Sequence, residues 1–357
     1  MNPKKIKELL ATVIAQNASD LHLTVGHSPI LRKNGNLIDM ENFDVLTPED
    51  TKTIILSLMT GEQQARFEKE KELDFAYSFG DKFRFRINVF MQREQAAASF
   101  RLVPFEIKTP QELNLPPVVG KFIEARQGLV LITGASSQGK STTLACLIDG
   151  INHLRREHII TIEDPMEYVF KDDKSVIQQR EVHKDTLSFA KALRAALRED
   201  PNVIMVGEMR DLETISTATT AAETGHLVFA TLHTNSASQT IHRIIDVFPP
   251  HQQDQIRAQV ASSLLGVVSQ QLIPSTSGEF LPACEIMLAT AAVSNLIREN
   301  KIHEIPAIIE TSAEQGMISF NKYLTDLVSQ GKVSKETAMF YSLSPDDLRS
   351  RLGGNRL

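Results

Sequence analysis

A lysine between a glycine and a serine carries the clearest chemical signal in the sequence. Residues 134–141 read G-A-S-S-Q-G-K-S, which matches the phosphate-loop pattern G-x-x-x-x-G-K-[ST]. The loop follows an apolar run at 128–133 and precedes a helix-like run at 141–154. Backbone N–H groups of such a loop and of the helix N-terminus bind a β-phosphate, because both present partial positive charge. We expect Lys140 to reach the β- and γ-phosphate oxygens of ATP and the Ser141 hydroxyl to ligate Mg²⁺.

The expected nucleotide contacts cover the whole loop and the start of the following helix. They are Gly134, Ala135, Ser136, Ser137, Gln138, Gly139, Lys140, Ser141 and Thr142. Ser137 stands where many phosphate loops have a glycine, so a residue with a Cβ must accept the backbone angles that the loop imposes, at some cost in nucleotide affinity. The alternative interpretation of the segment is an ordinary strand-to-helix turn with a solvated lysine.

Two acidic clusters follow apolar runs further along the chain. Glu208 comes after the run at 202–206 and Gly207, and Glu163 and Asp164 end the run that starts at His158. Because the carboxyl ends of parallel strands line the ligand crevice of an α/β sheet, both clusters should face the phosphate loop. One carboxylate would hold hydrated magnesium and another would activate water. Acids after strands are also common helix caps, which is the alternative for either cluster alone.

Two histidines lie at opposite ends of another short strand, predicted at 226–232. His226 begins that strand, whereas His233 follows it, close to Thr231 and Thr234. A neutral imidazole and neighbouring hydroxyls can respond to a γ-phosphate through hydrogen bonds, so His233 is the better candidate for this role. His226 can equally be a structural residue. A metal site is less favoured, since no third ligand lies nearby in the sequence.

Arginines of the amino-terminal part are candidates for stabilising phosphate charge. Arg84 and Arg86 share one strand face by the period of two, and Arg101 lies on or beside another strand. A guanidinium can bind two phosphate oxygens at once and stabilise the charge of a transition state. By residue type alone, a solvated strand face is the favoured interpretation.

The elements that must position these residues fall into an α/β arrangement of two domains. Alternating runs and amphipathic helices over 1–103 predict a small α+β domain with helices on one face of its sheet, including a hairpin at Asn34-Gly35 and a helix starting at Thr47-Pro48. Residues 104–117 contain four prolines and are the best linker candidate. Over 118–357, β-branched apolar runs alternate with helical segments, which predicts a parallel sheet covered on both faces and a helical tail from about residue 294.

Composition and charge exclude several classes of protein. The 357 residues have a net charge of -6, which argues against a dedicated nucleic-acid binder with a basic face. The two cysteines, Cys146 and Cys284, cannot form a disulfide scaffold or a zinc site made of cysteines. No apolar run has the roughly 18–20 residues that span a bilayer. We therefore expect a soluble protein of a reducing, intracellular compartment.

These residues together resemble the PilT family of secretion-type motor ATPases, which power type IV pilus retraction. The motifs that carry the resemblance are A-S-D-L-H-L at 18–23, F-R-F-R-I-N at 83–88, the phosphate loop, T-I-E-D-P-M-E-Y at 161–168, the segment 197–214, and T-G-H-L-V-F-A-T-L-H-T at 224–234. The last three look like the family's Asp box, Walker B region and His box. The resemblance implies a PAS-like amino-terminal domain followed by a RecA-like P-loop ATPase domain with a helical carboxyl-terminal part, assembled as a hexameric ring.

The resemblance also implies roles for the candidate residues. Glu208 would be the catalytic carboxylate and a magnesium ligand, partly through water, with Glu163 and Asp164 supporting magnesium and water. His233 would act in catalysis, and His226 would contact the nucleotide. Arg84, with Arg86 or Arg101, would approach the nucleotide at a domain or subunit boundary. The sequence departs from the family pattern at three positions. In the phosphate loop, Ala135 replaces the usual proline and Ser137 replaces the usual glycine. The third departure is Met166, within the Asp box.

Partners and location follow from the same resemblance. It implies a homohexamer at the cytoplasmic face of the inner membrane, bound to a pilus platform protein, with a paralogous motor ATPase as an optional further partner. Relatives that extend pili usually carry a long extra amino-terminal domain and a four-cysteine metal insertion. We expect neither in this chain, because its two isolated cysteines cannot form such a metal site, and this favours retraction over extension. Two alternatives stay open: a PilU-like accessory subunit that binds nucleotide and assists a partner motor, and a RecA-like DNA translocase, which the acidic balance disfavours.

Overall fold

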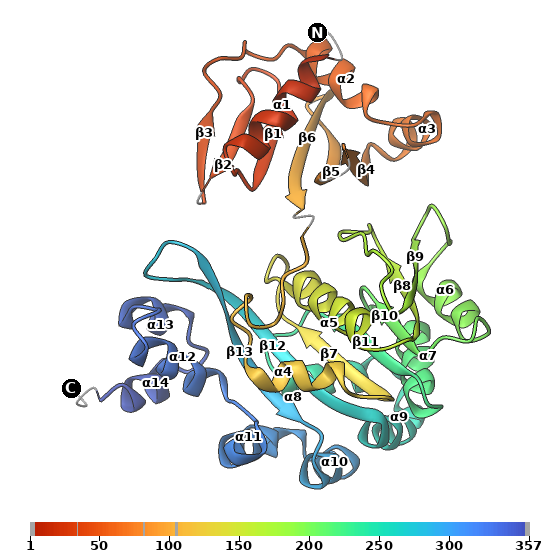
Figure 1. Cartoon of the computed structure of the whole chain (residues 1–357), viewed down its shortest axis with the longest axis vertical. Coiled ribbons are helices and arrows are strands. Elements are labelled where there is room, and N and C mark those ends of the chain that lie inside the picture. The colour runs from red at the N-terminus through yellow and green to blue at the C-terminus, as the bar shows by residue number, and fades with distance from the viewer. Residues whose placement is uncertain (1–3, 34, 81–82, 104–105, 354–357) are drawn as a thin grey trace. The chain divides into compact units, whose positions relative to one another are not determined.

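Two compact units make up the chain in the computed structural model, which describes residues 4–33, 35–80, 83–103 and 106–353 (Figure 1). Unit 1 contains the residues up to Glu106 together with Pro165–Val169, and unit 2 contains Ile107–Asp164 and Phe170–Leu357. The predicted fold class, a smaller sheet domain before a larger α/β domain, is confirmed. The sequence analysis did not foresee that Pro165–Val169, the second half of the Asp-box motif, groups with unit 1.

An antiparallel sheet of six strands forms unit 1, in the order β3-β2-β1-β6-β5-β4. Its elements are α1 (Lys4–Ala15), β1 (Asp20–Leu23), β2 (Ile30–Lys33), β3 (Asn36–Asp39), α2 (Pro48–Ser57), α3 (Gly61–Glu70), β4 (Glu72–Phe79), β5 (Phe83–Gln92) and β6 (Gln95–Val103). The predicted hairpin is present as β2 and β3, although Asn34 of its turn lies outside the described residues. Strand β6 is the strand expected on or beside Arg101, for which the sequence analysis gave no bounds, whereas helix α3 has no counterpart in the sequence-based prediction.

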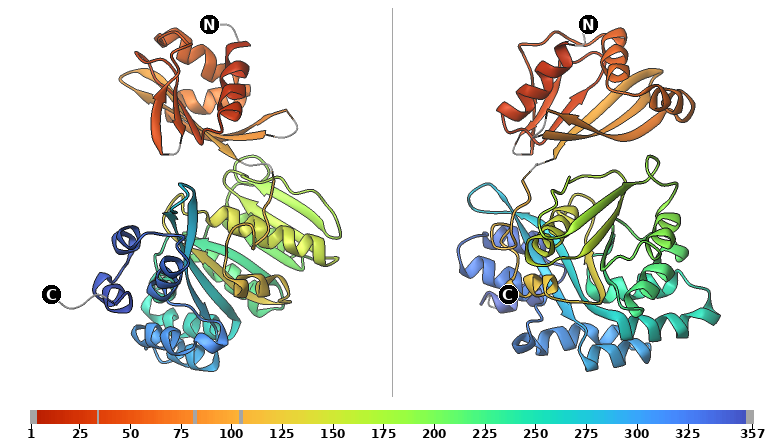
Figure 2. Two further views of the ribbon diagram at one scale, coloured as in Figure 1. Left: turned by 60° about the vertical axis from the view of Figure 1, so that its left-hand side comes forward. Right: turned by 45° about the vertical axis from the view of Figure 1, so that its right-hand side comes forward.

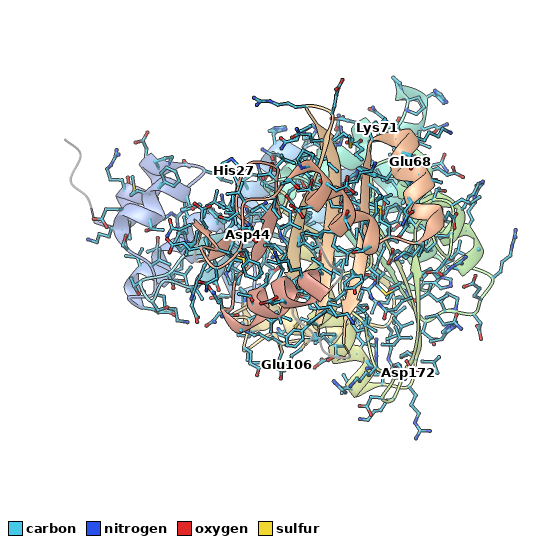
Figure 3. The ribbon with its side chains drawn as sticks, turned by 90° about the horizontal axis from the view of Figure 1, so that it is seen from above. His27, Asp44, Glu68, Lys71, Glu106 and Asp172 are labelled. Carbon is cyan, nitrogen blue, oxygen red and sulfur yellow. The ribbon has the colours of Figure 1, made fainter. Side chains whose placement is uncertain are left out.

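The core of unit 1 lies on the sheet face to which every second side chain of its strands points. In β5, Phe85, Ile87 and Val89 are fully buried, while Arg84 and Arg86 between them stay half-buried on the other face. The exposed side chains of His27, Asp44, Glu68 and Lys71 are labelled in Figure 3 and belong to the loops and helix α3 around that core. The buried side chains of β5 form one core with those of α1 and α2, such as Leu9 and Ile55, so the apolar face of the sheet packs on these helices.

The sheet of unit 2 has seven strands in the order β13-β12-β7-β11-β10-β8-β9. All neighbouring pairs are parallel except β12 and β13. The strands are β7 (Gly128–Thr133), β8 (His158–Glu163), β9 (Val176–Glu181), β10 (Val203–Val206), β11 (Leu227–Leu232), β12 (Leu264–Pro274) and β13 (Phe280–Leu288). Every residue of β7, β10 and β11 is buried, because helices cover both faces of the sheet (Figure 1).

Helices and short 3-10 turns surround this sheet. They are α4 (Pro117–Gly120), α5 (Lys140–Leu154), α6 (Phe189–Ala196), α7 (Leu212–Glu223), α8 (Ala237–Asp246), α9 (Pro250–Ser263), α10 (Ala291–Arg298), α11 (Ile305–Thr311), α12 (Phe320–Ser329), α13 (Lys335–Tyr341) and α14 (Pro345–Arg351), with turns η1 (Lys121–Ile123), η2 (Ile302–Glu304) and η3 (Ala313–Gln315). The carboxyl-terminal helices α12–α14 pack on Ile273 of β12 and Ala283 of β13 (Figure 2). Within the described ranges, no helix has the length and apolar character needed to cross a membrane.

Candidate nucleotide-binding and hydrolysis site

The phosphate loop joins β7 to α5 in the conformation that its glycines permit. Gly134 has φ 148° and Gly139 has φ 78°, both in the region that favours glycine. A Cβ added at Gly134 would lie 2.3 Å from the carbonyl oxygen of Gln270 in β12. Ser137 has φ 63°, so the loop does impose a left-handed angle at the position where the sequence has a serine. The structure thus explains why glycine is needed at 134 and why Ser137 is under strain.

The start of α5 fits a phosphate group. Gly139 is the N-cap residue, and no side chain caps the helix. The N–H groups of the first turn, which begins at Lys140, therefore point toward the loop together with the positive end of the helix dipole. The Lys140 ammonium is buried and donates to the carbonyl oxygens of Gly134 at 2.9 Å and Ala135 at 2.8 Å. A positive charge and uncapped amides thus meet at one point, which is the donor set that a phosphate requires.

Parallel registers bring the predicted catalytic residues to that same edge. Thr133 of β7 pairs with Leu232 of β11, and Val206 of β10 pairs with Ala230 of β11. Gly134, His233 and the Gly207-Glu208 pair each follow these strand ends. The expectation that the Glu208 cluster faces the phosphate loop agrees with this geometry.

A chain of polar contacts connects Lys140 with Glu208 through His233. The Lys140 Nζ lies 3.5 Å from His233 Nδ1, and His233 Nε2 lies 3.0 Å from Glu208 Oε1. Burial, and then the positive charges of Lys140 and Arg210, lower the pKa of His233 below its usual 6.5, while Glu208 acts in the opposite direction. We assign His233 as a neutral imidazole that carries its proton on Nε2, donates to Glu208 and accepts from Lys140.

Arg210 is a site residue that the sequence analysis missed. Its Nε lies 2.5 Å from Glu208 Oε1, and this hydrogen bond raises the pKa of the guanidinium. Asp164 contributes a further attraction to Arg210. The available signal was the spacing Glu208-Met209-Arg210 directly after a buried strand. Glu208 and Asp164 therefore share one electrostatic environment around Arg210.

Glu163 is buried at the end of β8 and held by polar neighbours. It accepts hydrogen bonds from the Thr161 hydroxyl at 2.7 Å and from the Gln179 amide at 3.1 Å. These contacts fix the position of the carboxylate at the same edge of the sheet as the phosphate loop, since β8 is parallel to β10.

His226 lies at the wrong end of its strand for the site around Lys140. It precedes β11, whose first residue pairs with Gly128 at the start of β7. Its Nδ1 lies 2.9 Å from the carbonyl oxygen of Ala221 in the last turn of α7. Because a strand rises about 3.3 Å per residue, the length of β11 separates His226 from the phosphate loop. The structure thus places His226 away from the phosphate loop of its own chain and in contact with α7, so a structural role fits it, and its contact with the nucleotide stays a prediction.

The three candidate arginines lie together on the sheet of unit 1. Arg86 of β5 pairs directly with Arg101 of β6, and Arg101 pairs with Asp20 of β1. Carboxylates relieve the repulsion: Arg101 binds Asp20 at 2.9 Å, and Arg86 binds Glu167 at 3.2 Å.

Arg84 contacts the same short segment of unit 1 as Arg86. Its Nε donates to the carbonyl oxygen of Met166 at 3.1 Å. The segment Pro165–Val169 is thus attached to β5 through two arginines, which explains its grouping with unit 1.

A phosphate loop at the carboxyl edge of a parallel sheet, with carboxylates on neighbouring strand ends, defines the class of P-loop nucleotide-binding proteins. The chain belongs to the family described as Type II/IV secretion system protein, which matches residues 2–304. The family resemblance predicted from the motifs is therefore confirmed.

Individual relatives cover nearly the whole chain. It is 44% identical to the type IV pilus retraction ATPase PilT of Pseudomonas aeruginosa, over 96% of this chain and 99% of that protein. It is 38% identical to the type IV pilus ATPase PilU of the same organism, over 97% of this chain and 90% of that protein. The fold is similar to a crystal structure of the pilus retraction motor PilT with bound ADP, at a TM-score of 0.88 and 46% identity, covering 97% of this chain and 99% of that one.

Replacing Gly134 tests the geometry of the loop. In Gly134→Ala, the new Cβ meets the Gln270 carbonyl, so the loop must move and we expect ADP affinity to fall by at least about tenfold. Calorimetric titration with ADP measures the change. The matched control is Gly61→Ala in α3, where nothing lies within 4 Å of the added Cβ. Unchanged affinity in Gly134→Ala would contradict the described loop conformation.

The tautomer of His233 has a consequence for pH dependence. Protonation removes the acceptor that faces Lys140 and adds a like charge, so the neutral form is the active one. Since the pKa of His233 is lowered from 6.5, the active form persists at neutral pH and is lost only as the pH falls below that value.

His233→Gln keeps an acceptor and a donor but does not titrate, so it isolates this effect. We expect the ratio of wild-type to variant kcat/KM for ATP to stay constant between about pH 7 and 8. At more acid pH the ratio should fall, approaching about tenfold for each unit. Comparing both proteins at each pH cancels the titration of ATP itself. A ratio that stays flat in acid would refute the assignment.

Proposed function

We propose that this chain is a Mg²⁺-dependent ATPase that powers retraction of a type IV pilus. The observation that carries the proposal is the contact chain from Lys140 through His233 to Glu208 at the edge where the phosphate loop opens. The identity of 44% with a pilus retraction ATPase over almost the full length supports the biological role. ATP is the substrate and Mg²⁺ the accompanying ion.

Different residues of the site bind the phosphates, hold the magnesium ion and activate water. The amides at the start of α5 and the Lys140 ammonium hold the β- and γ-phosphates. When the nucleotide binds, Lys140 exchanges its hydrogen bonds to the loop carbonyls for hydrogen bonds to phosphate oxygens. Bound Mg²⁺ would neutralise phosphate charge, with Ser141 as ligand and Glu208 and Asp164 near its water shell. Glu208 orients a water molecule and accepts its proton, while His233 fixes the Glu208 carboxylate through Nε2–H. Within the described residues, no group of three or more His, Cys, Asp or Glu side chains is placed to hold a metal ion.

Assembly completes the proposal. We place the chain in a homohexamer in the cytoplasm, at the inner face of the membrane, where it acts on the pilus platform protein. Arg84, with Arg86 or Arg101 as alternatives, then supplies positive charge to a nucleotide bound by a neighbouring subunit. Nucleic acid has no part in this function.

The accessory role is the second candidate. The 38% identity with PilU over 97% of the chain favours it, as does the strained Ser137 in the phosphate loop. Phosphate release by the purified protein alone separates the two, because an autonomous motor turns over ATP without a partner and an accessory subunit does not.

Two substitutions separate nucleotide binding from hydrolysis. Lys140→Ala removes the charge that neutralises the phosphates, so hydrolysis should fall by at least about a hundredfold while the fold and the ring persist. Glu208→Gln should retain ADP binding and lose a similar factor in kcat, since the amide keeps an acceptor for His233 and Arg210 but cannot accept the proton of the attacking water. Phosphate release, ADP calorimetry and light scattering measure these properties. Wild-type turnover in Lys140→Ala would remove the proposed mechanism.

Cells provide the test of the biological role. Deleting the gene should abolish twitching and raise the number of surface pili, because assembled pili are no longer withdrawn. The wild-type gene should restore both properties, and the Lys140→Ala form, expressed at the same level, should restore neither. Normal pilus number with retained retraction in the deletion strain would contradict the retraction function.

A further inference from the structure

Strand β12 continues past the end of its neighbour. The parallel pairing of β7 with β12 ends at Thr133 and Ser269, whereas β12 runs on to Pro274. Among the described residues, no strand therefore pairs with the β7 side of β12 beyond Ser269. The phosphate loop lies along that edge. Gly134 is so close to β12 that an added Cβ would lie 2.3 Å from the carbonyl oxygen of Gln270.

Two glutamines join the loop to this edge reciprocally. The Gln270 side chain in β12 donates from its amide to the backbone carbonyl of Gln138 in the loop, at 2.6 Å. The Gln138 side chain accepts from the backbone N–H of Leu272, also at 2.6 Å. Each side chain thus satisfies a backbone group of the other segment, and Gln138 satisfies an edge N–H that has no strand partner on that side.

Gln270 is itself held firmly. It is 4% exposed, and its amide oxygen accepts from the Thr143 hydroxyl of α5 at 2.9 Å. A Cβ at Gly139 would lie 3.2 Å from its amide nitrogen. Gln270 therefore connects β12 with the loop through Gln138 and with α5 through Thr143.

The residue held by these bonds, Gln138, directly follows the strained residue. Ser137, with φ 63°, immediately precedes Gln138. A left-handed backbone disfavours a residue with a Cβ by roughly five- to thirtyfold relative to right-handed alternatives. Without an opposing interaction, part of the population would leave the conformation that binds phosphate.

We propose that Gln138 and Gln270 are positioning residues, which hold the phosphate loop in its nucleotide-binding conformation against the strain at Ser137. The inference rests on the proposed nucleotide site, and it adds a function for the Gln138 side chain, which faces β12 instead of the phosphates. Bound nucleotide holds the same loop through its own contacts. These hydrogen bonds of Gln138 and Gln270, which we call the clamp, therefore act on nucleotide affinity more than on the rate of hydrolysis at saturation.

A double-mutant cycle tests the proposal with ADP as the probe. Gln138→Met keeps the length of the side chain but removes the acceptor, and we expect it to weaken ADP binding about fivefold. In Ser137→Gly the left-handed angle costs nothing, so adding Gln138→Met to it should change ADP affinity less than about twofold. For ATP hydrolysis, KM should rise in Gln138→Met with a much smaller change in kcat.

The controls keep the outcomes distinct. Gln271→Met makes the same substitution at the next residue of β12 and should leave ADP affinity as in the wild type. Melting temperatures of all variants show whether each is folded. If Gln138→Met alone is unstable, its effect on ADP affinity can still be measured in the Ser137→Gly background. An equal loss in both backgrounds, or no loss in either, overturns the clamp. Absence of ADP binding to the wild type would instead overturn the proposed function.

Discussion

The contact chain from Lys140 through His233 to Glu208 depends on three parallel strands that end at the same level. The pairing of Thr133 with Leu232 places the phosphate loop beside His233, and the neighbouring pairing of β10 with β11 places Glu208 on the other side of the imidazole. A slip of one residue in either pairing would turn the side chains to the opposite face of the sheet. The buried, mostly apolar strands protect this arrangement, because their registers are set by a core on both faces.

Charge balance around the site follows from that geometry. Lys140 and Arg210 flank a neutral His233, and the carboxylates of Glu208 and Asp164 offset them. An imidazole between two cations stays neutral, so it can connect an ammonium donor to a carboxylate acceptor without adding charge. The loop carbonyls that hold Lys140 supply a similar compensation, and phosphate oxygens can replace them.

Strain and restraint occur side by side in the phosphate loop. Ser137 adopts an angle that glycine would accept freely, and the bonds between Gln138 and β12 lie directly after it. The Asp-box motif shows another division of labour, because Glu163 and Asp164 belong to unit 2 whereas Pro165–Val169 belongs to unit 1 with Arg84 and Arg86. A contiguous sequence motif thus serves two structural units.

The sequence alone determined the phosphate loop, the α/β class and the main parallel strands, because apolar runs, turn residues and the spacing of Gly134, Gly139 and Lys140 are local properties. The bounds of β6 and the whole of β12 escaped prediction, since small residues in one and the glutamines in the other hide the strand pattern. The role of Gln270, the pairing of Arg210 with Glu208 and the remote place of His226 required the tertiary structure. These properties depend on which strands become neighbours and in which register, and that outcome is decided by packing of the whole core and not by any single segment.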